Sequence, residues 1–217
     1  GEPMNKQVVS TSISVGLATG LYGISFGAIG AAAGLSIPAV MLLSLLMFSG
    51  ASQFAFVGII AAGGAPITAI SSAWLLGVRN SFYALRLSPV LGPNGLWKLL
   101  AAQLTVDESN AVSAAQDGRT NQKLGFWLTG GAVYVFWNSA TFLGAIGGNL
   151  LGSVETWGLD GAAAAAFLGL LWPRLKNNLM LAGAGALVAL IAIPFTPAGI
   201  PVLLAAAVAL LPIGRRS

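Results

Sequence analysis

Long apolar runs, separated by short polar or proline-containing breaks, occupy most of the chain. Runs of about 20 apolar residues match the hydrocarbon core of a bilayer. The pattern therefore predicts an all-α, polytopic membrane protein with seven to eight transmembrane or re-entrant helices. The predicted helices cover residues 8–34, 38–62, 66–89, 124–151 and 178–195, with shorter apolar segments at 161–172 and 199–211.

Residues 94–116 decide between seven and eight segments, because they are apolar at first and acidic afterwards. Lysine and arginine accumulate in the cytoplasmic loops of membrane proteins. With a cytoplasmic N-terminus and eight crossings, seven of the ten cations lie inside: Lys6, Arg119, Lys123, Arg174, Lys176, Arg215 and Arg216. This distribution favours eight segments, although Arg86 and Lys98 then fall on the opposite side.

One transmembrane domain over residues 8–212 accounts for all these segments. Residues 1–7 combine an expression scar before Met4 with a cytoplasmic N-terminus, and residues 213–217 form a cytoplasmic C-terminus. The stretch "FGAIGAAAGLS" (26–36) resembles "LGAIGGNLLGS" (143–153), which indicates an internal repeat. Glycine-rich low complexity produces the same match by chance, so both explanations stay open.

The composition narrows the possible chemistry. Hydrophobic residues make up 56% of the chain and charged residues 7%, which is too little charge for a soluble surface. There is no cysteine and no histidine, which excludes disulfides, histidine-based metal sites and a histidine general base. We expect no metal and no cofactor, and the net charge of +4 fits cytoplasmic loops better than nucleic acid.

Glycines spaced by four residues occur in the first predicted helix. Gly16 and Gly20 form one such pair, and Gly23 and Gly27 form another. Small residues at this spacing let two membrane helices approach closely.

The stretch "SGASQ" (49–53) interrupts the second apolar run with polar and small residues. Ser49, Ser52 and Gln53 share a helical face, and Gly50 favours a local break. A broken helix frees backbone groups that can face a substrate. The alternative is a packing face whose serines bond to their own helix.

The stretch "GVRNSFYALRLSP" (77–89) places cations in the third apolar run. Arg79, Tyr83 and Arg86 share one face, and Asn80 lies close to it. An arginine in the middle of a membrane helix costs at least about 2.5–3.5 kcal/mol, so Arg79 needs an anion, a carboxylate or water. Arg86, near the helix end, can extend to the headgroups instead.

Two acids and an asparagine complete the set of candidate groups. Asp107 and Glu108 are adjacent, and a carboxylate near the membrane can pair with Arg79, take up a proton or hold an ammonium group. Solvated acids in a loop are the alternative. Asn138 interrupts the long apolar run at 124–151, either as a ligand or as a hydrogen-bonding contact between helices. Together, a cation, acids and small residues predict a cavity for a zwitterion.

These motifs also carry a resemblance. "FSGASQF" (48–54), "GVRNSFYALRLSP" (77–89) and "LTVDESNA" (104–111) occur in the order and spacing of AzlC-type branched-chain amino-acid permeases. "AAAAAFLGLLWPRL" (162–175) resembles a later segment of that family, so the similarity covers roughly residues 9–211. Matched position by position, the motif residues are Gly50, Ser52, Gln53, Arg79, Tyr83, Asp107 and Glu108.

The resemblance implies export of branched-chain amino acids, and often of methionine, across the bacterial inner membrane. It also implies proton antiport and a small AzlD-type membrane subunit as partner; a homo-oligomer is compatible with the sequence. Where relatives often have a histidine after the arginine, this chain has Asn80, so proton coupling would use Asp107 or Glu108. The expected substrate-binding residues are Ser49, Gly50, Ser52, Gln53, Arg79, Asn80, Tyr83 and Asn138.

Two other function classes are weighed against a secondary transporter. A channel or accessory membrane subunit predicts conduction without counterflow. An enzyme would need Ser49 or Ser52 to act with Asp107, an uncommon arrangement, and we expect none. A phosphate-binding G-x-x-x-x-G-K-[ST] loop is missing from the sequence, which speaks against ATP-driven transport within this chain.

Overall fold

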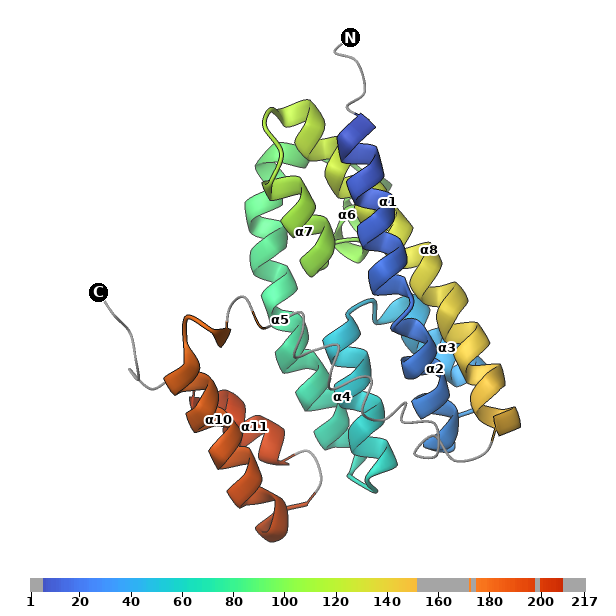
Figure 1. Ribbon diagram of the computed structural model, residues 1–217, viewed down its shortest axis with the longest axis vertical. Coiled ribbons are helices and arrows are strands. Elements are labelled where there is room, and N and C mark those ends of the chain that lie inside the picture. The colour runs from blue at the N-terminus through green and yellow to red at the C-terminus, as the bar shows by residue number, and fades with distance from the viewer. Residues whose placement is uncertain (1–5, 152–171, 173–174, 198–199, 209–217) are drawn as a thin grey trace.

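The structure is a computed structural model that describes residues 6–151, 172, 175–197 and 200–208 (Figure 1). Every element in these residues is helical, which confirms the all-α prediction. The elements are α1 (Lys6–Gly20), α2 (Gly23–Ala32), α3 (Ile37–Leu46), α4 (Gly50–Ala61), α5 (Pro66–Leu91), α6 (Leu96–Gln103), α7 (Asp107–Ala114), α8 (Arg119–Leu151), α10 (Leu179–Ala192), the 3-10 turn η2 (Ile193–Phe195) and α11 (Ile200–Ala207). The predicted segment at 161–172, apart from Trp172, lies outside the described residues, as do Arg174, Arg215 and Arg216.

Few of the described helices are long enough to cross a membrane. In the part of the chain that the structure describes, one helical stretch of 27 residues, 6–32, is both long and apolar enough to cross a membrane. The helices α5 and α8, with 26 and 33 residues, reach about 39 and 50 Å and exceed the bilayer core by length alone. One apolar helix of this length also occurs in soluble proteins.

The helices α1 and α2 pack along α8 through glycines. Gly16 lies against Ala132 and Gly20 against Phe136, four residues further on both helices, so α1 and α8 run in the same direction. A Cβ atom at Gly27 would overlap a backbone oxygen of α8. The predicted small-residue faces are therefore confirmed, and we call this contact the glycine seam.

The predicted helix at 38–62 is broken and folds back on itself. Residues 47–49 separate α3 from α4, which confirms the break predicted before Gly50. The start of α3 lies at the end of α2, where Val40 contacts Gly30. The returning α4 packs Phe54 edge-on against Phe26, with ring centroids 5.8 Å apart. The pair α3/α4 is a hairpin that enters and leaves at the same end of the bundle (Figure 1).

Residues 94–116 form a second hairpin, so the prediction of one crossing there is wrong. Along α6, Trp97 packs against Trp127, and Leu104 then lies against Gly130. Along α7 the chain returns, with Val112 against Gly125. The physical reason for the turn lies in the polar residues from Thr105 onward, which a continuous apolar helix would carry through its centre. The choice between seven and eight segments stays a prediction, because residues 152–171 lie outside the described residues.

The two hairpins enter the bundle from opposite ends. As a result, the cations lie at other positions than a straight crossing at 94–116 would give them. The start of α8 meets the end of α5, where the Arg119 side chain donates to the carbonyl oxygens of Pro89 and Val90 at 2.9 and 2.8 Å. The N-terminus of α1 lies at this same end (Figure 1). The end therefore gathers five of the cations described between residues 6 and 151: Lys6, Arg86, Lys98, Arg119 and Lys123. The mismatch of Arg86 and Lys98 disappears once residues 94–116 turn back.

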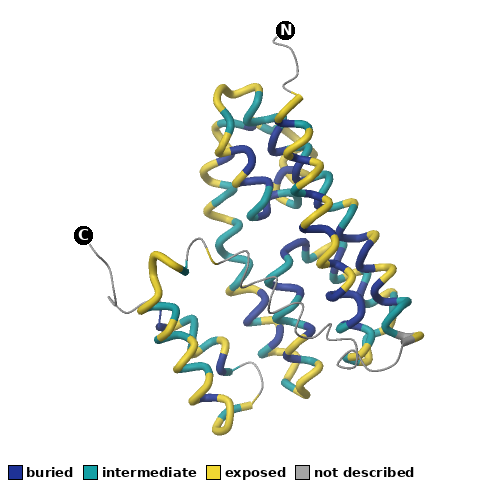
Figure 2. Tube along the Cα trace, viewed as in Figure 1, coloured by how far each residue is buried: buried dark blue, intermediate teal, exposed yellow. Residues whose placement is uncertain are grey.

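One group of buried residues lies where α2, α4 and α8 meet, and a second group lies between α5, α6 and α8 (Figure 2). Phe26, Val57 and Trp137 belong to the first group, together with Phe48 and Val106 from the tips of the two hairpins. The predicted internal repeat has no direct test here and stays a prediction.

Candidate functional site

The break between α3 and α4 is held open by side chains. A helix that ends at Leu46 leaves its last carbonyl groups without helical partners. Gln53 donates through Nε2 to the carbonyl oxygens of Met47 and Ser44, at 2.8 and 3.3 Å. Its Oε1 accepts a hydrogen bond of 2.8 Å from Trp137 Nε1. Gln53 is fully buried with both ends of its amide bonded to protein, so it supports the break.

The serines beside Gln53 join the break to α5. Ser52 Oγ lies 2.7 Å from the carbonyl oxygen of Ala73 and 3.0 Å from Ser49 Oγ. A hydroxyl has one proton, so Ser52 donates to the carbonyl and accepts from Ser49. Within the described residues, no side chain caps the N-terminus of α4. The amides at Gly50 and Ala51 are thus donors left over in the first turn of this helix.

An ion pair links the middle of α5 to the start of α7. Arg79 Nη2 lies 2.6 Å from Asp107 Oδ2, and Tyr83 donates to Asp107 Oδ1 at 2.7 Å. The two charged side chains are about one-third exposed, 32% for Arg79 and 29% for Asp107. Asp107 is also the first residue of α7, where the helix dipole stabilises a negative charge. Arg79, Tyr83 and Asp107, hereafter the charged cluster, are therefore brought together as the sequence suggested.

The turn before Asp107 has its own cap. Ser109 Oγ accepts from the backbone N–H of Val106 at 3.0 Å and donates to the carbonyl of Leu104 at 2.6 Å. These two bonds of one serine hydroxyl fix the N-terminus of α7 and with it the Asp107 carboxylate. Glu108 follows as the second residue of α7 and is half-buried.

The three asparagines of the region differ in position. Asn138 donates to the carbonyl of Tyr134 in its own helix at 2.8 Å, and Asn80 is half-buried on α5 beside Arg79. Asn110 is buried on α7. Among the described residues, the side-chain oxygens of all three and Nε of Arg79 are buried without a hydrogen-bond partner. The oxygens of Asn80 and Asn110 can therefore still accept hydrogen bonds close to the charged cluster, because these residues follow Arg79 and Asp107 in α5 and α7.

The two hairpin tips meet near the middle of α5 and α8. A Cβ at Gly77, two residues before Arg79, would lie 3.4 Å from Ser52 Oγ. From the other hairpin, Gln103 Nε2 donates to the carbonyl of Leu45 at 2.7 Å. The N-termini of α4 and α7 thus approach the same level of the bundle from opposite ends (Figure 1).

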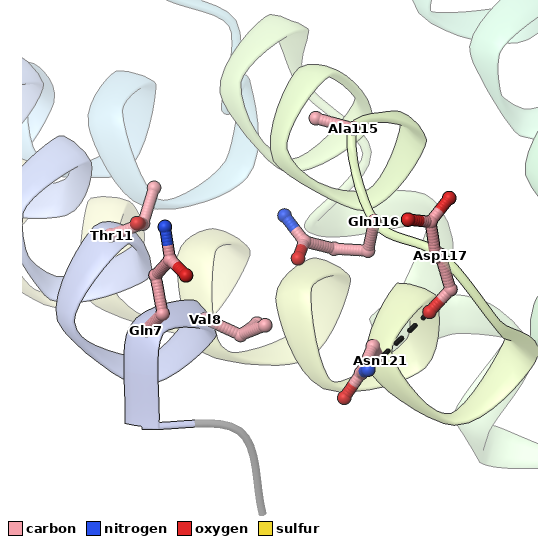
Figure 3. A pocket seen from close by; sticks show the side chains of 7 residues that line it. All are labelled: Gln7, Val8, Thr11, Ala115, Gln116, Asp117 and Asn121. Carbon is pink, nitrogen blue, oxygen red and sulfur yellow. Dashed lines mark hydrogen bonds between the residues drawn. The ribbon is translucent and has the colours of Figure 1, made fainter.

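A polar cavity of about 290 Å³ lies elsewhere, at the cation-bearing end (Figure 3). Its lining comes from α1 and from the connection between α7 and α8, and it includes Gln7, Gln116 and Asp117. Asn121 in its wall donates to the backbone carbonyl of Asp117 at 3.3 Å. The predicted site residues do not line this cavity. In the residues that the structure describes, no three acids group as metal ligands.

Sequence reasoning missed Gln103, Tyr134 and Trp137. Gln103 is the one amide near the end of a short apolar helix, which was a usable signal. Tyr134 and Trp137 lie within "VYVFWNS" (133–139), where Asn138 was the predicted site residue. Their roles depend on contacts with residues far along the chain, which the local sequence does not show.

Comparison with known proteins supports one assignment. The family model described as AzlC protein matches residues 14–151, well over half of the chain. No curated protein and no solved structure matches the chain. The matched residues contain the glycine seam, both hairpins and the charged cluster. The chain belongs to the AzlC family.

Proposed function

We propose that the protein is a secondary transporter that exports leucine, isoleucine and valine, with methionine as a further substrate, across the bacterial inner membrane. Membership of the AzlC family supports membrane transport of branched-chain amino acids. The observation that carries the proposal is the charged cluster, placed where two broken helices meet. Transporter sites are commonly built from such discontinuous helices.

The charged cluster fits the two ends of an amino-acid zwitterion. The Arg79 guanidinium is a partner for the substrate carboxylate, and the Asp107 carboxylate is a partner for its ammonium group. In the structure these two side chains bond each other at 2.6 Å. A zwitterion entering between them replaces one internal ion pair with two external ones. The free amides at the start of α4 add donors for the carboxylate.

Proton coupling follows from the same carboxylate. When Asp107 takes up a proton, it loses its attraction for the substrate ammonium group and for Arg79. Proton and amino acid then compete for one site, which is the requirement for antiport. Glu108, the next residue, is the second candidate for this proton.

The cation distribution supports an orientation. Lysine and arginine mark the cytoplasmic side, and the end that holds Lys6, Lys98 and Lys123 therefore faces the cytoplasm. The helices α5 and α6 present large apolar side chains outward there, including Phe82 at 66% exposure and Leu96 at 78%. These faces suit lipid and the small AzlD-type subunit, which we propose as partner.

Counterflow in liposomes tests the proposal. Labelled isoleucine is supplied outside vesicles loaded with unlabelled valine, with this chain alone and with a small partner subunit. We expect saturable accumulation that excess leucine abolishes. Loss of one charge-assisted hydrogen bond is worth about 1.5–3 kcal/mol, so Asp107→Asn and Arg79→Gln should lower the counterflow rate about 10- to 100-fold.

Two matched variants separate the site from general charge effects. Asp117→Asn and Arg86→Gln remove the same charges at exposed positions and should leave counterflow unchanged. Each variant must elute as folded protein and keep its melting temperature. Solute flux without counterflow would instead indicate a channel, and absence of both from folded protein with its partner would contradict a transporter.

A further inference from the structure

One backbone oxygen ties three helices together at the centre of the bundle. The carbonyl oxygen of Leu45 accepts a hydrogen bond from Gln103 Nε2 at 2.7 Å and another from Tyr134 Oη at 3.1 Å. A carbonyl has two lone pairs, and both are used here. Leu45 lies at the end of α3, Gln103 at the end of α6 and Tyr134 in α8. The bond from Gln103 thus connects the tips of the two hairpins.

This bond lies close in sequence to both groups that we propose bind the substrate. Leu45 is five residues before Gly50, where the free amides of α4 begin. Gln103 is four residues before Asp107, which holds the charged cluster. A change in the Gln103–Leu45 distance therefore moves the α4 amides relative to the Asp107 carboxylate.

Apolar contacts also surround the two tips, and they do not fix the same geometry. Phe48 packs edge-on against Tyr134 with ring centroids 4.8 Å apart, and Leu104 and Val106 belong to the same apolar cluster. Hydrophobic contact is non-directional, whereas a hydrogen bond depends on distance and angle. In the described part of the chain, the bond from the Gln103 amide to Leu45 is a directional contact between the tips.

We infer that Gln103 is a positioning residue that sets the spacing of the two hairpin tips. This spacing lets one zwitterion bind both halves of the site, which are the amides at the start of α4 for its carboxylate and Asp107 for its ammonium group. This inference rests on the proposed function. A positioning role affects different ligands differently, whereas a general stabilising role affects all ligands equally. Gln103 matters for ligands that use both halves, and it is neutral for ligands that use only one.

Valine and its two one-ended analogues provide the test. Isobutylamine keeps the ammonium group of valine and lacks the carboxylate, while isovalerate keeps the carboxylate and lacks the ammonium group. Inhibition constants against labelled valine are measured for the wild type and for Gln103→Met, which keeps the side-chain length and removes the amide. One lost hydrogen bond corresponds to roughly a three- to tenfold change in affinity.

We expect Gln103→Met to weaken valine binding three- to tenfold and to leave both analogues within about twofold of the wild type. Gln103→Asn keeps the amide but is too short, and should behave like Gln103→Met. The control is Gln116→Met, because Gln116 donates only within its own hairpin, to the Val112 carbonyl at 3.1 Å. Equal weakening of all three ligands, or of none, would overturn the inference.

A second measurement decides the point without transport or binding. The chain has no cysteine, so Leu46→Cys and Ala102→Cys can carry a pair of nitroxide labels next to the two bonded residues. Both positions are exposed. Dipolar broadening should be clear with Gln103 present and reduced with Gln103→Met. Unchanged broadening in Gln103→Met would refute the positioning role of Gln103. If the broadening falls in Gln103→Met but the wild type binds no valine, only the transporter proposal is refuted.

Discussion

Adding one methyl group to the glycine seam tests how closely α2 and α8 approach. At Gly27 a Cβ would overlap the carbonyl oxygen of Thr141 and lie 2.7 Å from the backbone nitrogen of Ala145. Both are main-chain atoms of a packed helix, so neither can rotate away as a flexible side chain would. Overpacking of this kind costs typically about 1–3 kcal/mol, while the intrinsic helix preference for alanine over glycine returns about 1 kcal/mol.

Because both contacts are with main-chain atoms that cannot move aside, overpacking should cost about 2–3 kcal/mol, and the net cost of Gly27→Ala is about 1–2 kcal/mol. In a chain of this size 1 kcal/mol shifts the melting temperature by about 2–4 °C, so we expect a fall of about 2–8 °C. Thermal unfolding of detergent-purified protein, followed by intrinsic fluorescence, measures the change.

The matched control is Gly147→Ala on α8. No atom lies within 4 Å of a Cβ at that position, so only the helix preference acts and the melting temperature should stay level or rise. If Gly27→Ala and Gly147→Ala melt at the same temperature, the helices lie further apart than the structure shows, and the reasoning about the seam is wrong.

Three further perturbations address the site and its orientation. Tyr83→Phe keeps the ion pair but removes the 2.7 Å bond to the Asp107 carboxylate, and should raise the half-saturating isoleucine concentration about 10- to 100-fold in counterflow. Gln53→Met leaves buried carbonyls unsatisfied and should lower the melting temperature by about 2–12 °C in the same unfolding assay. Lys98→Cys should react with a membrane-impermeant maleimide only from the cytoplasmic side, and labelling of intact cells would contradict the orientation.

Local sequence features predicted part of this site correctly. The small residues at 49–53 do coincide with a helix break, and the costly arginine in α5 does have a carboxylate partner. Both predictions depend on short-range physics: helix propensity around Gly50, and the cost of leaving Arg79 without a counter-ion. Pairing of Arg79 with Asp107 was one of three roles considered for that carboxylate.

The path of the chain through residues 94–116 was beyond such reasoning. The segment is apolar at first and polar from Thr105 onward. That pattern fits a crossing that ends in polar residues as well as a hairpin, and nothing in its periodicity chooses the hairpin. The turn is stabilised from outside, because Gln103 finds its acceptor on Leu45, 58 residues away. Likewise the local sequence does not show that Gln53 bonds across the break and with Trp137, while its predicted contact with substrate stays a prediction. Long-range hydrogen bonds decide both cases.

The glycine seam also has a consequence for how the protein is made. The glycines of the seam, on α1 and α2, leave the ribosome more than one hundred residues before the part of α8 that they contact. At synthesis rates of about 5–20 residues per second, that delay is roughly 6–25 s. During this interval the first helix lies in the bilayer with a row of bare glycines that lipid tails or another membrane helix can contact. A protein that binds this row during insertion would keep the first helix available for α8 and protect it from the wrong neighbour.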